Sequence, residues 1–329
     1  MTFMYTRKTF LALAAGLTLA ALGPAQAQDK PPIRILIGFA PGGSTDTVAR
    51  VIADKLRGPL RQTVIVENKP GAGGRLAAEA LKNAPPDGLT YMIAPNATAV
   101  FQHLLYPAAV LKYDVLTDLA PVAMLVSYPL ALAVGTKTGA KTTSEYVAWA
   151  KANPKEGSFG SAGLGGHTHF SGLELAKAAG IELSVVPYRG NGPLATDLLG
   201  GQVPAGIMTA GDIIQHQRSG QVRVLATFGA KRSPLLPDVP TLTEQGYKVD
   251  TGDAWTGMWA PAKTSKEELE RMQSALKFVL EMPEVRDLLI NKQTLQPDFQ
   301  TGAAMDKTLR KELAYWGPVI KETGFKPEQ

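Results

Sequence analysis

Two glycine-rich stretches carry the residues best suited to bind an anion, and the first joins an apolar run of strand length to a helical pattern. It reads Phe39-Ala40-Pro41-Gly42-Gly43-Ser44-Thr45-Asp46. Glycines let the backbone approach a ligand closely, and the first turn of a helix offers N–H groups that favour a carboxylate or a phosphate. The hydroxyls of Ser44 and Thr45 add donors. An alternative interpretation is a plain turn in which Ser44, Thr45 or Asp46 caps the helix.

The second stretch also lies between a short strand pattern and a helical pattern. It reads Ser161-Ala162-Gly163-Leu164-Gly165-Gly166-His167-Thr168-His169. Two such loops, one in each half of the chain, are suited to close on one anion. His167 and His169 are also candidate metal ligands, but no paired acids stand near them, so ordinary hydrogen-bonding histidines are the default interpretation.

Known catalytic motifs are incomplete in these stretches. No Lys-Ser or Lys-Thr follows the glycines of the first stretch, which argues against a Walker loop. Phe159 stands two residues before Ser161, where a nucleophile elbow needs a glycine. The chain has no cysteine, which excludes thiol nucleophiles, zinc–thiolate sites and disulfides. The sequence therefore predicts no catalytic residue, no metal site and no cofactor.

Other candidate side chains stand near the ends of predicted strands, and each has two interpretations. The aromatic candidates, which either line a ligand pocket or belong to the core, are Phe39, Tyr188, Trp255 and Trp259. Arg75 and Arg189 pair either with a ligand carboxylate or with a surface acid. Asp212 either accepts a hydrogen bond from a ligand amine or hydroxyl, or caps a helix.

Apolar runs of strand length alternate with helical patterns, which is the rhythm of parallel sheets covered by helices. The predicted strands are 33–39, 64–66, 90–94, 130–134, 158–160, 183–187, 206–209, 222–228 and 257–260. The predicted helices are 45–56, 75–82, 169–179, 193–199, 266–280, 284–289 and 303–322. Thr142 and Glu145 fit a capping box that opens one more helix.

The order of these elements predicts two α/β lobes. Two consecutive sets of strands and helices are followed by a helical tail that returns to the first lobe. We place the boundaries in the turn-rich stretches 127–129 and 251–253. Lobe 1 then comprises residues 28–128 plus 253–329, and lobe 2 comprises residues 129–252. A cleft between two lobes is a natural ligand site.

The N-terminus predicts export from the cytoplasm. Arg7 and Lys8 precede an apolar run at 10–22, which is followed by the small-residue triplet Ala25-Gln26-Ala27. This is the pattern of a signal peptide that occupies residues 1–27. Its removal takes two positive charges from the formal net charge of +5 and leaves +3. Because the remaining basic residues are scattered, no nucleic-acid partner is predicted.

Several dissimilar motifs follow one another through most of the chain. Besides residues 39–46 with Arg50, they are Val66-Glu67-Asn68-Lys69-Pro70-Gly71-Ala72-Gly73-Gly74, Pro86-Asp87-Gly88, Val186-Pro187-Tyr188-Arg189-Gly190, Asp197-Leu198-Leu199-Gly200-Gly201-Gln202-Val203 and Pro237-Asp238-Val239-Pro240-Thr241. In this order and spacing they resemble the Bug, or TctC-like, extracytoplasmic solute receptors of tripartite tricarboxylate transporters. The set is more specific than any single glycine-rich loop.

The resemblance implies a periplasmic-binding-protein type II fold, or Venus flytrap, in which two α/β lobes close by hinge motion over a ligand in the cleft. Carried over by position, it implies that the first loop holds a ligand carboxylate through Phe39, Ala40, Gly43, Ser44, Thr45 and Asp46. It implies that lobe 2 contacts the rest of the ligand through Ser161, Gly163, Thr168, Thr209 and Asp212. His169 matches the usual histidine of the family. His167 departs from a position that is more often small or polar, so we expect it to bind the ligand and affect specificity.

The function that the resemblance implies is a monomeric periplasmic receptor, and not an enzyme. It would capture a small organic carboxylate and deliver it to the membrane subunits of a tripartite tricarboxylate transporter. Phe39 and Trp255, without a cluster of basic residues for a tricarboxylate, favour an aromatic or short-chain mono- or dicarboxylate. Two alternatives stay open. A sensor that presents its ligand to a histidine kinase would use the same cleft, and a periplasmic hydrolase or lyase would need a catalytic constellation that the sequence does not show.

Overall fold

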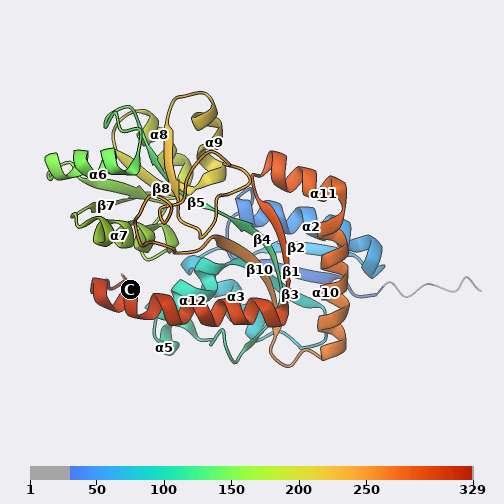
Figure 1. Ribbon diagram of the computed structural model, residues 1–329. Helices are drawn as coiled ribbons and strands as arrows, with labels where there is room; N and C mark the ends of the chain where they lie inside the picture. Colours follow the sequence, from blue (N-terminus) through green and yellow to red (C-terminus); the bar gives the residue numbers. More distant parts are fainter. Residues whose placement is uncertain (1–29, 328–329) are drawn as a thin grey trace, which may run out of the picture. The chain divides into compact units, whose positions relative to one another are not determined.

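The computed structural model describes residues 30–327 of the chain. The predicted signal peptide, residues 1–27, lies outside the described residues. From residue 32 onward the described chain contains two separate β-sheets, each covered by helices (Figure 1). No helix within residues 30–327 is both long and apolar enough to cross a membrane.

The first sheet has the strand order β11-β4-β10-β3-β1-β2. Its strands are β1 (Ile33–Ile37), β2 (Val64–Asn68), β3 (Thr90–Pro95), β4 (Leu119–Tyr128), β10 (Ala254–Pro261) and β11 (Gln296–Thr301). β1 pairs in parallel with β2 and β3, whereas β10 runs antiparallel to β3 and β4. The carboxyl ends of β1, β2 and β3 therefore lie at one edge of this sheet.

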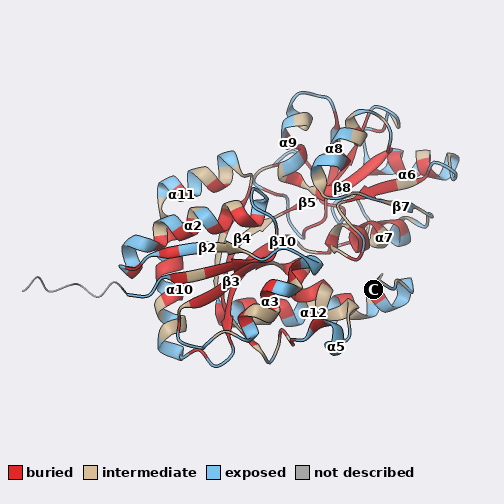
Figure 2. Cartoon of the chain, turned by 180° about the vertical axis from the view of Figure 1, so that it is seen from behind, coloured by how far each residue is buried: buried red, intermediate tan, exposed pale blue. Residues whose placement is uncertain are grey.

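Helices cover both faces of the first sheet. Ile33, Ile35 and Ile37 share a core with α2 (Ser44–Leu60), α10 (Lys266–Glu281) and α11 (Pro283–Asp287). Leu36 shares the opposite core with α3 (Arg75–Lys82) and α12 (Gly302–Thr323). Alternate residues of β1 thus face different cores, as the pleat of a strand requires, and the inner strands β3 and β10 are buried on both sides (Figure 2).

Short helical segments connect the longer elements of the first sheet. They are η1 (Ala72–Gly74), η2 (Ala97–Phe101), α4 (Gln102–Leu105), α5 (Ala108–Leu111) and η3 (Leu288–Lys292). The position of α2 matters most for the first glycine-rich stretch. Val48, Ile52 and Leu56 recur at helical spacing and are fully buried, so this apolar face fixes α2 against the sheet and the stretch lies at its beginning.

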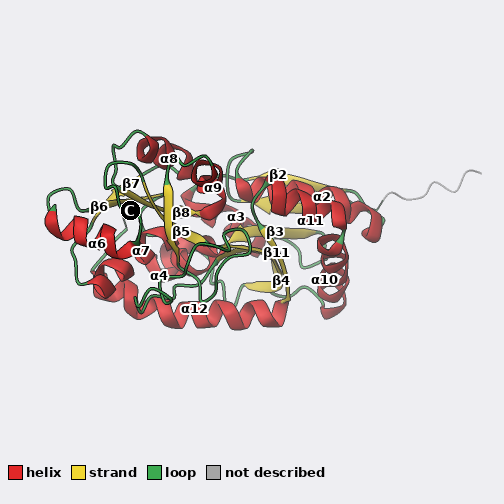
Figure 3. Cartoon of the chain, turned by 45° about the horizontal axis from the view of Figure 1, so that its top comes forward, coloured by secondary structure: helices red, strands yellow, loops and turns green. Residues whose placement is uncertain are grey.

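The second sheet has the strand order β7-β6-β8-β5-β9. Its strands are β5 (Leu130–Val134), β6 (Ser158–Ser161), β7 (Ser184–Pro187), β8 (Ala205–Thr209) and β9 (Arg223–Thr227). β6 pairs in parallel with β7 and β8. One core contains α6 (Thr143–Ala152) and α7 (His167–Ala179), and the other contains α8 (Asn191–Leu199) and α9 (Ala210–Arg218) (Figure 3).

The predicted class of two α/β lobes is confirmed, and most predicted elements are present with ends shifted by a few residues. β4, β11, α9 and the short helices between residues 97 and 111 were not predicted. Residues 127–129 were expected as a turn, but Ser127 and Tyr128 complete β4 because they pair with β10. The first sheet uses segments 33–128 and 254–301, and the second uses 130–227. The lobe boundaries themselves stay a prediction.

Candidate functional site

Loops leave both sheets at the carboxyl ends of parallel strands. In the first sheet, residues 38–43 lead from β1 into α2. In the second, residues 162–166 lead from β6 into α7, residues 188–190 lead from β7 into α8, and β8 passes directly into α9. Ligands of open α/β sheets bind outside these strand ends. Every ligand-binding residue predicted from the sequence lies at one of these strand ends, in the loop after it or in the first turn of the next helix.

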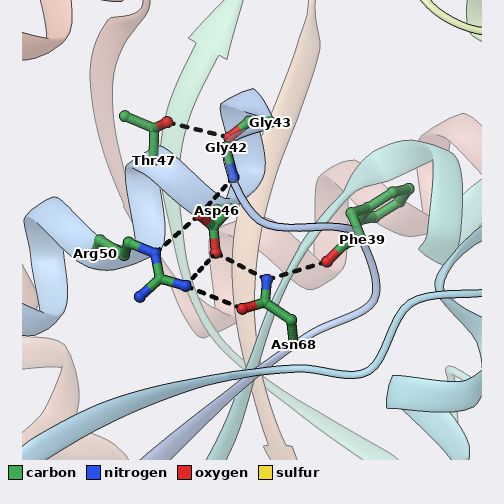
Figure 4. A network of polar contacts seen from close by, with 7 residues as sticks. All are labelled: Phe39, Gly42, Gly43, Asp46, Thr47, Arg50 and Asn68. Atoms are coloured by element: carbon green, nitrogen blue, oxygen red, sulfur yellow. Dashed lines mark hydrogen bonds and ion pairs between the residues drawn. The ribbon is translucent and has the colours of Figure 1, made fainter.

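The Asp46 carboxylate ties down the first loop (Figure 4). Its Oδ2 accepts hydrogen bonds from Gly42 N at 2.9 Å and from Arg50 Nε at 2.8 Å. Its Oδ1 accepts from Arg50 Nη2 at 3.0 Å and from Asn68 Nδ2 at 2.8 Å. Asn68 Nδ2 also donates to the Phe39 carbonyl at 3.0 Å. The loop from Phe39 to Gly42 is therefore fastened to α2 and β2.

The protein's own hydrogen bonds keep Asp46 ionised. Burial of Asp46 by itself raises the pKa, but hydrogen bonds from Arg50, Gly42 and Asn68 outweigh that effect and lower the pKa to about 2. Asp46 is 2% exposed, and both of its oxygens are engaged. Asp46 therefore fixes the conformation of the first loop, and its carboxylate has no oxygen free for a ligand.

Hydroxyl groups organise the second loop. Ser161 Oγ donates to the Gly163 carbonyl at 2.7 Å and lies 2.8 Å from Thr168 Oγ1. Because a carbonyl only accepts, the Ser161 proton is committed to Gly163, and Thr168 must donate its own proton to Ser161. The Thr168 oxygen keeps only lone pairs for a further partner.

His169 has the same place in the second loop that Asp46 has in the first. Gly165 N donates to His169 Nδ1 at 3.0 Å. In both loops the acceptor is the third residue of the helix, and the donor stands just before the N-cap glycine. Burial lowers the pKa of His169 to about 4, so its imidazole is neutral at pH 7 and Nδ1 is free to accept.

Gly43 and Gly166, the N-cap residues of α2 and α7, leave these helices without a side-chain cap. Their φ angles of −74° and −111° suit any residue. A Cβ on Gly43 would meet nothing nearer than the Ala40 carbonyl oxygen at 3.8 Å, and one on Gly166 would meet nothing within 4 Å. Neither backbone nor packing requires glycine here, and the first-turn N–H groups are left for another acceptor.

Asn191, the first residue of α8, joins that helix to the junction of β8 and α9. Its Nδ2 donates to Thr209 Oγ1 at 3.2 Å and to Asp212 Oδ2 at 2.6 Å. Burial raises the pKa of the Asp212 carboxyl, and the Asn191 hydrogen bond acts against that shift. The N-cap of α9 is Thr209, and Asp212 is the third residue of the helix, so the alternative in which Asp212 caps α9 is wrong.

His167 engages both of its ring nitrogens within the protein. Nε2 lies 2.9 Å from the Thr251 carbonyl oxygen, and Nδ1 lies 3.4 Å from Asn96 Nδ2. Burial lowers the pKa of His167 to about 4, although the Thr251 contact acts the other way. The neutral ring therefore donates from Nε2 and accepts at Nδ1. Neither ring nitrogen of His167 is therefore free to bind a ligand. The ring instead joins α7 to Asn96, the residue before η2.

Glu312 of α12 extends this network. Trp255 Nε1 donates to Glu312 Oε1 at 2.6 Å, and Asn96 Nδ2 donates to Oε2 at 3.2 Å. Burial raises the pKa of Glu312 to about 7, while the hydrogen bonds from Trp255 and Asn96 act against that shift. A polar chain through Glu312, Asn96 and His167 thus reaches Thr251, on the segment that leads into β10.

The remaining candidates divide between core and surface. Trp255 and Trp259 are 2% and 0% exposed, so the core interpretation is confirmed for both. Phe39 is only half-buried. Arg75 stacks on the Tyr106 ring with 3.9 Å between its guanidinium carbon and the ring centroid.

Sequence reasoning did not single out four side chains that hold the polar networks around the predicted residues, namely Asn68, Asn96, Asn191 and Glu312. The three asparagines stand at the end of a strand or at the start of a helix, and that position was a usable signal. Glu312 lies within a long helix, where nothing in its surroundings along the chain marks it.

Two grooves in the described part of the chain lie away from these loops. A groove of about 720 Å³ is lined mainly by residues 134–142 and 217–225. A smaller one of about 250 Å³ lies beside Trp255 and Glu312. Within residues 30–327 no three histidine, cysteine or acidic side chains are grouped so that they could hold a metal ion.

The described chain thus has two α/β lobes, and each carries a glycine-rich loop at the carboxyl end of a parallel strand. A family model described as the tripartite tricarboxylate transporter family receptor, TctC, matches residues 48–325. The chain belongs to this family, which confirms the resemblance inferred from its motifs.

Similar sequences support this assignment. A protein of the gbd 5' region in Cupriavidus necator is 37% identical, over 98% of this chain and 98% of its own length. BugT of Bordetella pertussis is 32% identical, over 97% of this chain and 98% of its own length.

Three solved structures have a similar fold. The periplasmic binding protein BugD has a TM-score of 0.76 at 30% identity, covering 91% of this chain and 100% of its own. MatC of Rhodopseudomonas palustris with bound malate has a TM-score of 0.75 at 29% identity, covering 88% and 98%. Another R. palustris protein, with adipate, has a TM-score of 0.79 at 27% identity, covering 90% and 98%.

Proposed function

We propose that this protein is an exported, monomeric receptor that captures a small organic mono- or dicarboxylate and delivers it to the membrane subunits of a tripartite tricarboxylate transporter. The observation that carries the proposal is the pair of helix starts at Gly43 and Gly166, where first-turn N–H groups have no side-chain cap. Each helix start follows the carboxyl end of a parallel strand, one in each sheet.

A carboxylate is the natural partner of such a pair. Each carboxylate oxygen accepts hydrogen bonds, and the helix dipole favours negative charge at the amino end. A hydrogen bond to a charged group contributes about 1.5 to 3 kcal/mol. Asp46 and His169 already fix the conformations of the two loops. Binding therefore loses little conformational entropy in these loops.

The negative charge of Asp46 is compatible with an anionic ligand. Arg50 binds the Asp46 carboxylate through Nε and Nη2, at 2.8 and 3.0 Å. Asn68 and Gly42 donate two more hydrogen bonds to it. The first loop therefore carries no unbalanced charge that would repel a carboxylate.

Structures of similar proteins contain malate and adipate, and both are carboxylates. Half-buried Phe39 leaves an aromatic carboxylate within the proposal, whereas Trp255 no longer supports one because its indole is in the core and bonded to Glu312.

A thermal-shift screen tests the proposal. The mature protein is unfolded and refolded to remove any carried-over solute, then heated with mono-, di- and tricarboxylates and with uncharged amides of the same carbon skeletons. A carboxylate at a hundred times its Kd should stabilise the fold by about 2.7 kcal/mol. The ligand should be recovered unchanged, and its uptake into vesicles that contain the membrane subunits should require this protein. A screen in which no carboxylate raises the Tm would contradict the proposal.

A further inference from the structure

The second sheet contributes a polar cluster whose hydrogen bonds can be followed atom by atom. β7 and β8 lie on either side of β6 and run parallel to it, so the starts of α8 and α9 lie at the same edge of the sheet. Asn191 Nδ2 donates to Thr209 Oγ1 at 3.2 Å and to Asp212 Oδ2 at 2.6 Å. These two acceptors use both amide hydrogens and fix which way the amide group faces.

The other atom of this amide is unused. Asn191 Oδ1 is buried and has no hydrogen-bond partner among the described residues. Buried polar atoms are rarely left unpaired, so an unpaired acceptor beside a candidate site indicates that a donor belongs there. An amide oxygen can be satisfied only by an N–H or O–H group.

Neighbouring groups in the second sheet have the same need. Within residues 30–327 no basic side chain forms a salt bridge with Asp212, and only one of its oxygens receives the Asn191 hydrogen bond. Thr168 has already donated its proton to Ser161 and keeps only lone pairs. The side chains of this end of the site therefore offer mainly acceptors, whereas α2 and α7 offer backbone donors.

We infer that Asn191 and Asp212 recognise a hydrogen-bond donor on the ligand, so that the ligand is a monocarboxylate with a hydroxyl or ammonium group at its far end. The inference rests on the proposed function, in which the helix starts hold the carboxylate. A second carboxylate at this end would bring no hydrogen-bond donor and would leave Asn191 Oδ1 unpaired. An unsubstituted chain would leave both acceptors without a donor.

Matched acids of four, five and six carbons test this. At each length, calorimetry compares the plain monoacid, the ω-hydroxy acid, the ω-amino acid and the diacid, from butanoate, 4-hydroxybutanoate, 4-aminobutanoate and butanedioate upward. At the length that fits, the hydroxy or amino acid should bind about tenfold or more tightly than the plain acid and the diacid.

Variants assign the preference to its residues. Asn191→Leu keeps the size of the side chain and should abolish the tenfold preference of the ω-hydroxy acid and the ω-amino acid over the plain monoacid. Asp212→Asn should weaken the ω-amino acid more than the ω-hydroxy acid. Asn291→Leu is the matched control, because Asn291 Nδ2 also donates to an aspartate, Asp287, at 2.7 Å, on α11 and η3.

The outcomes separate the two proposals. Carboxylates that bind without any preference for a donor, or a diacid that binds as tightly as the hydroxy and amino acids, would overturn the inference and leave the receptor function standing. If no carboxylate bound at all, the proposed function would fail and the inference with it. Circular dichroism of each variant shows that a lost preference does not come from a lost fold.

Discussion

Helix α6 and the site helices α2 and α7 begin with the same kind of hydrogen bond but differ in the type of residue at the N-cap. In each, the side chain of the third helical residue accepts the N–H of the residue just before the N-cap. Glu145 accepts from Lys141 at 2.7 Å in α6, as Asp46 and His169 accept in α2 and α7. The N-cap of α6 is Thr142, whose Oγ1 accepts from Glu145 N at 3.1 Å.

This difference teaches that loop shape and the supply of free N–H groups are set by separate residues. The third helical residue holds the loop in all three helices. The N-cap residue decides whether the first-turn N–H groups are satisfied by the chain itself. At α6, which belongs to no predicted site, a threonine uses one of them. At α2 and α7 the N-cap residue is a glycine, which has no side chain to accept a hydrogen bond. This lowers the stability of the helix by only a few tenths of a kcal/mol relative to serine.

Removing the shared hydrogen bond at α2 should have the largest effect. Asp46→Ala deprives Gly42, Arg50 and Asn68 of their acceptor at once. We expect the free energy of unfolding to fall by about 3 to 4 kcal/mol and the affinity for a carboxylate to fall by about a hundredfold. Chemical denaturation and calorimetry measure the two effects. Glu145→Ala breaks the corresponding bond at α6 and should leave affinity unchanged; equal losses of affinity in both variants would remove the distinction between the helices.

The start of η2 extends the comparison and can be tested by changing the pH. Its N-cap residue, Asn96, does not cap the helix with its side chain but donates a hydrogen bond to Glu312. Burial raises the Glu312 pKa from 4.5 to about 7, so the folded protein keeps a proton that the unfolded chain releases between these values. The contribution of Glu312 to the free energy of unfolding is therefore greatest below pH 4.5. It decreases by about 2 to 3 kcal/mol as the pH rises to about 7. Unfolding free energies measured across this window should slope less in Glu312→Gln. An identical slope in both proteins would exclude Glu312 as the source.

A serine at the glycine N-caps should turn the site helices into the α6 type. Both positions have room for a side chain and an extended backbone. Gly43→Ser and Gly166→Ser should each raise stability by about 0.5 kcal/mol and weaken carboxylate binding about tenfold, because the new hydroxyl competes for the N–H groups. The control is Gly58→Ser, at an exposed position within α2 that also has room for a Cβ. Full affinity in the Gly43→Ser variant would show that the open helix start is not needed.

The converse change at α6 should have the smallest effect. Thr142→Gly gives this helix an N-cap like those of α2 and α7, and stability should fall by only a few tenths of a kcal/mol. Carboxylate affinity should stay at the parent value, because α6 does not start at one of the site's strand ends. A second carboxylate site in this variant, seen as a change in calorimetric stoichiometry, would mean that an uncapped helix start is sufficient by itself.

Local spacing made part of this arrangement predictable. Thr142 and Glu145 were predicted to cap a helix because both partners lie within one turn, and the structure confirms the Thr142 cap. The glycine-rich loops were found because glycine and hydroxyl residues cluster along the chain. The Asn96–Glu312 bond joins positions 216 residues apart, and no local pattern reports such a distance.

The placement of polar side chains was harder to predict than their presence. His167 was expected to meet a ligand, but burial and two remote partners, Thr251 and Asn96, engage its nitrogens. β4 was missed for a similar reason, because its role as an inner strand depends on pairing with β10. Sequence patterns identified what each loop contains, and tertiary contacts decide which atoms stay free.

The pairing of β4 with β10 also fixes an order of events for a newly made chain. Every strand of the second sheet lies in the segment between these two strands, so that sheet can form from continuous chain while β4 still lacks both of its neighbours, β10 and β11. Closing so long a loop has an entropic cost and slows folding when it comes first. We therefore expect the second sheet to form early and the first to be completed only when β10 and then β11 arrive. Until then β4 is an apolar strand without a partner and β3 is an unprotected edge, which is the period in which this chain is most prone to aggregate.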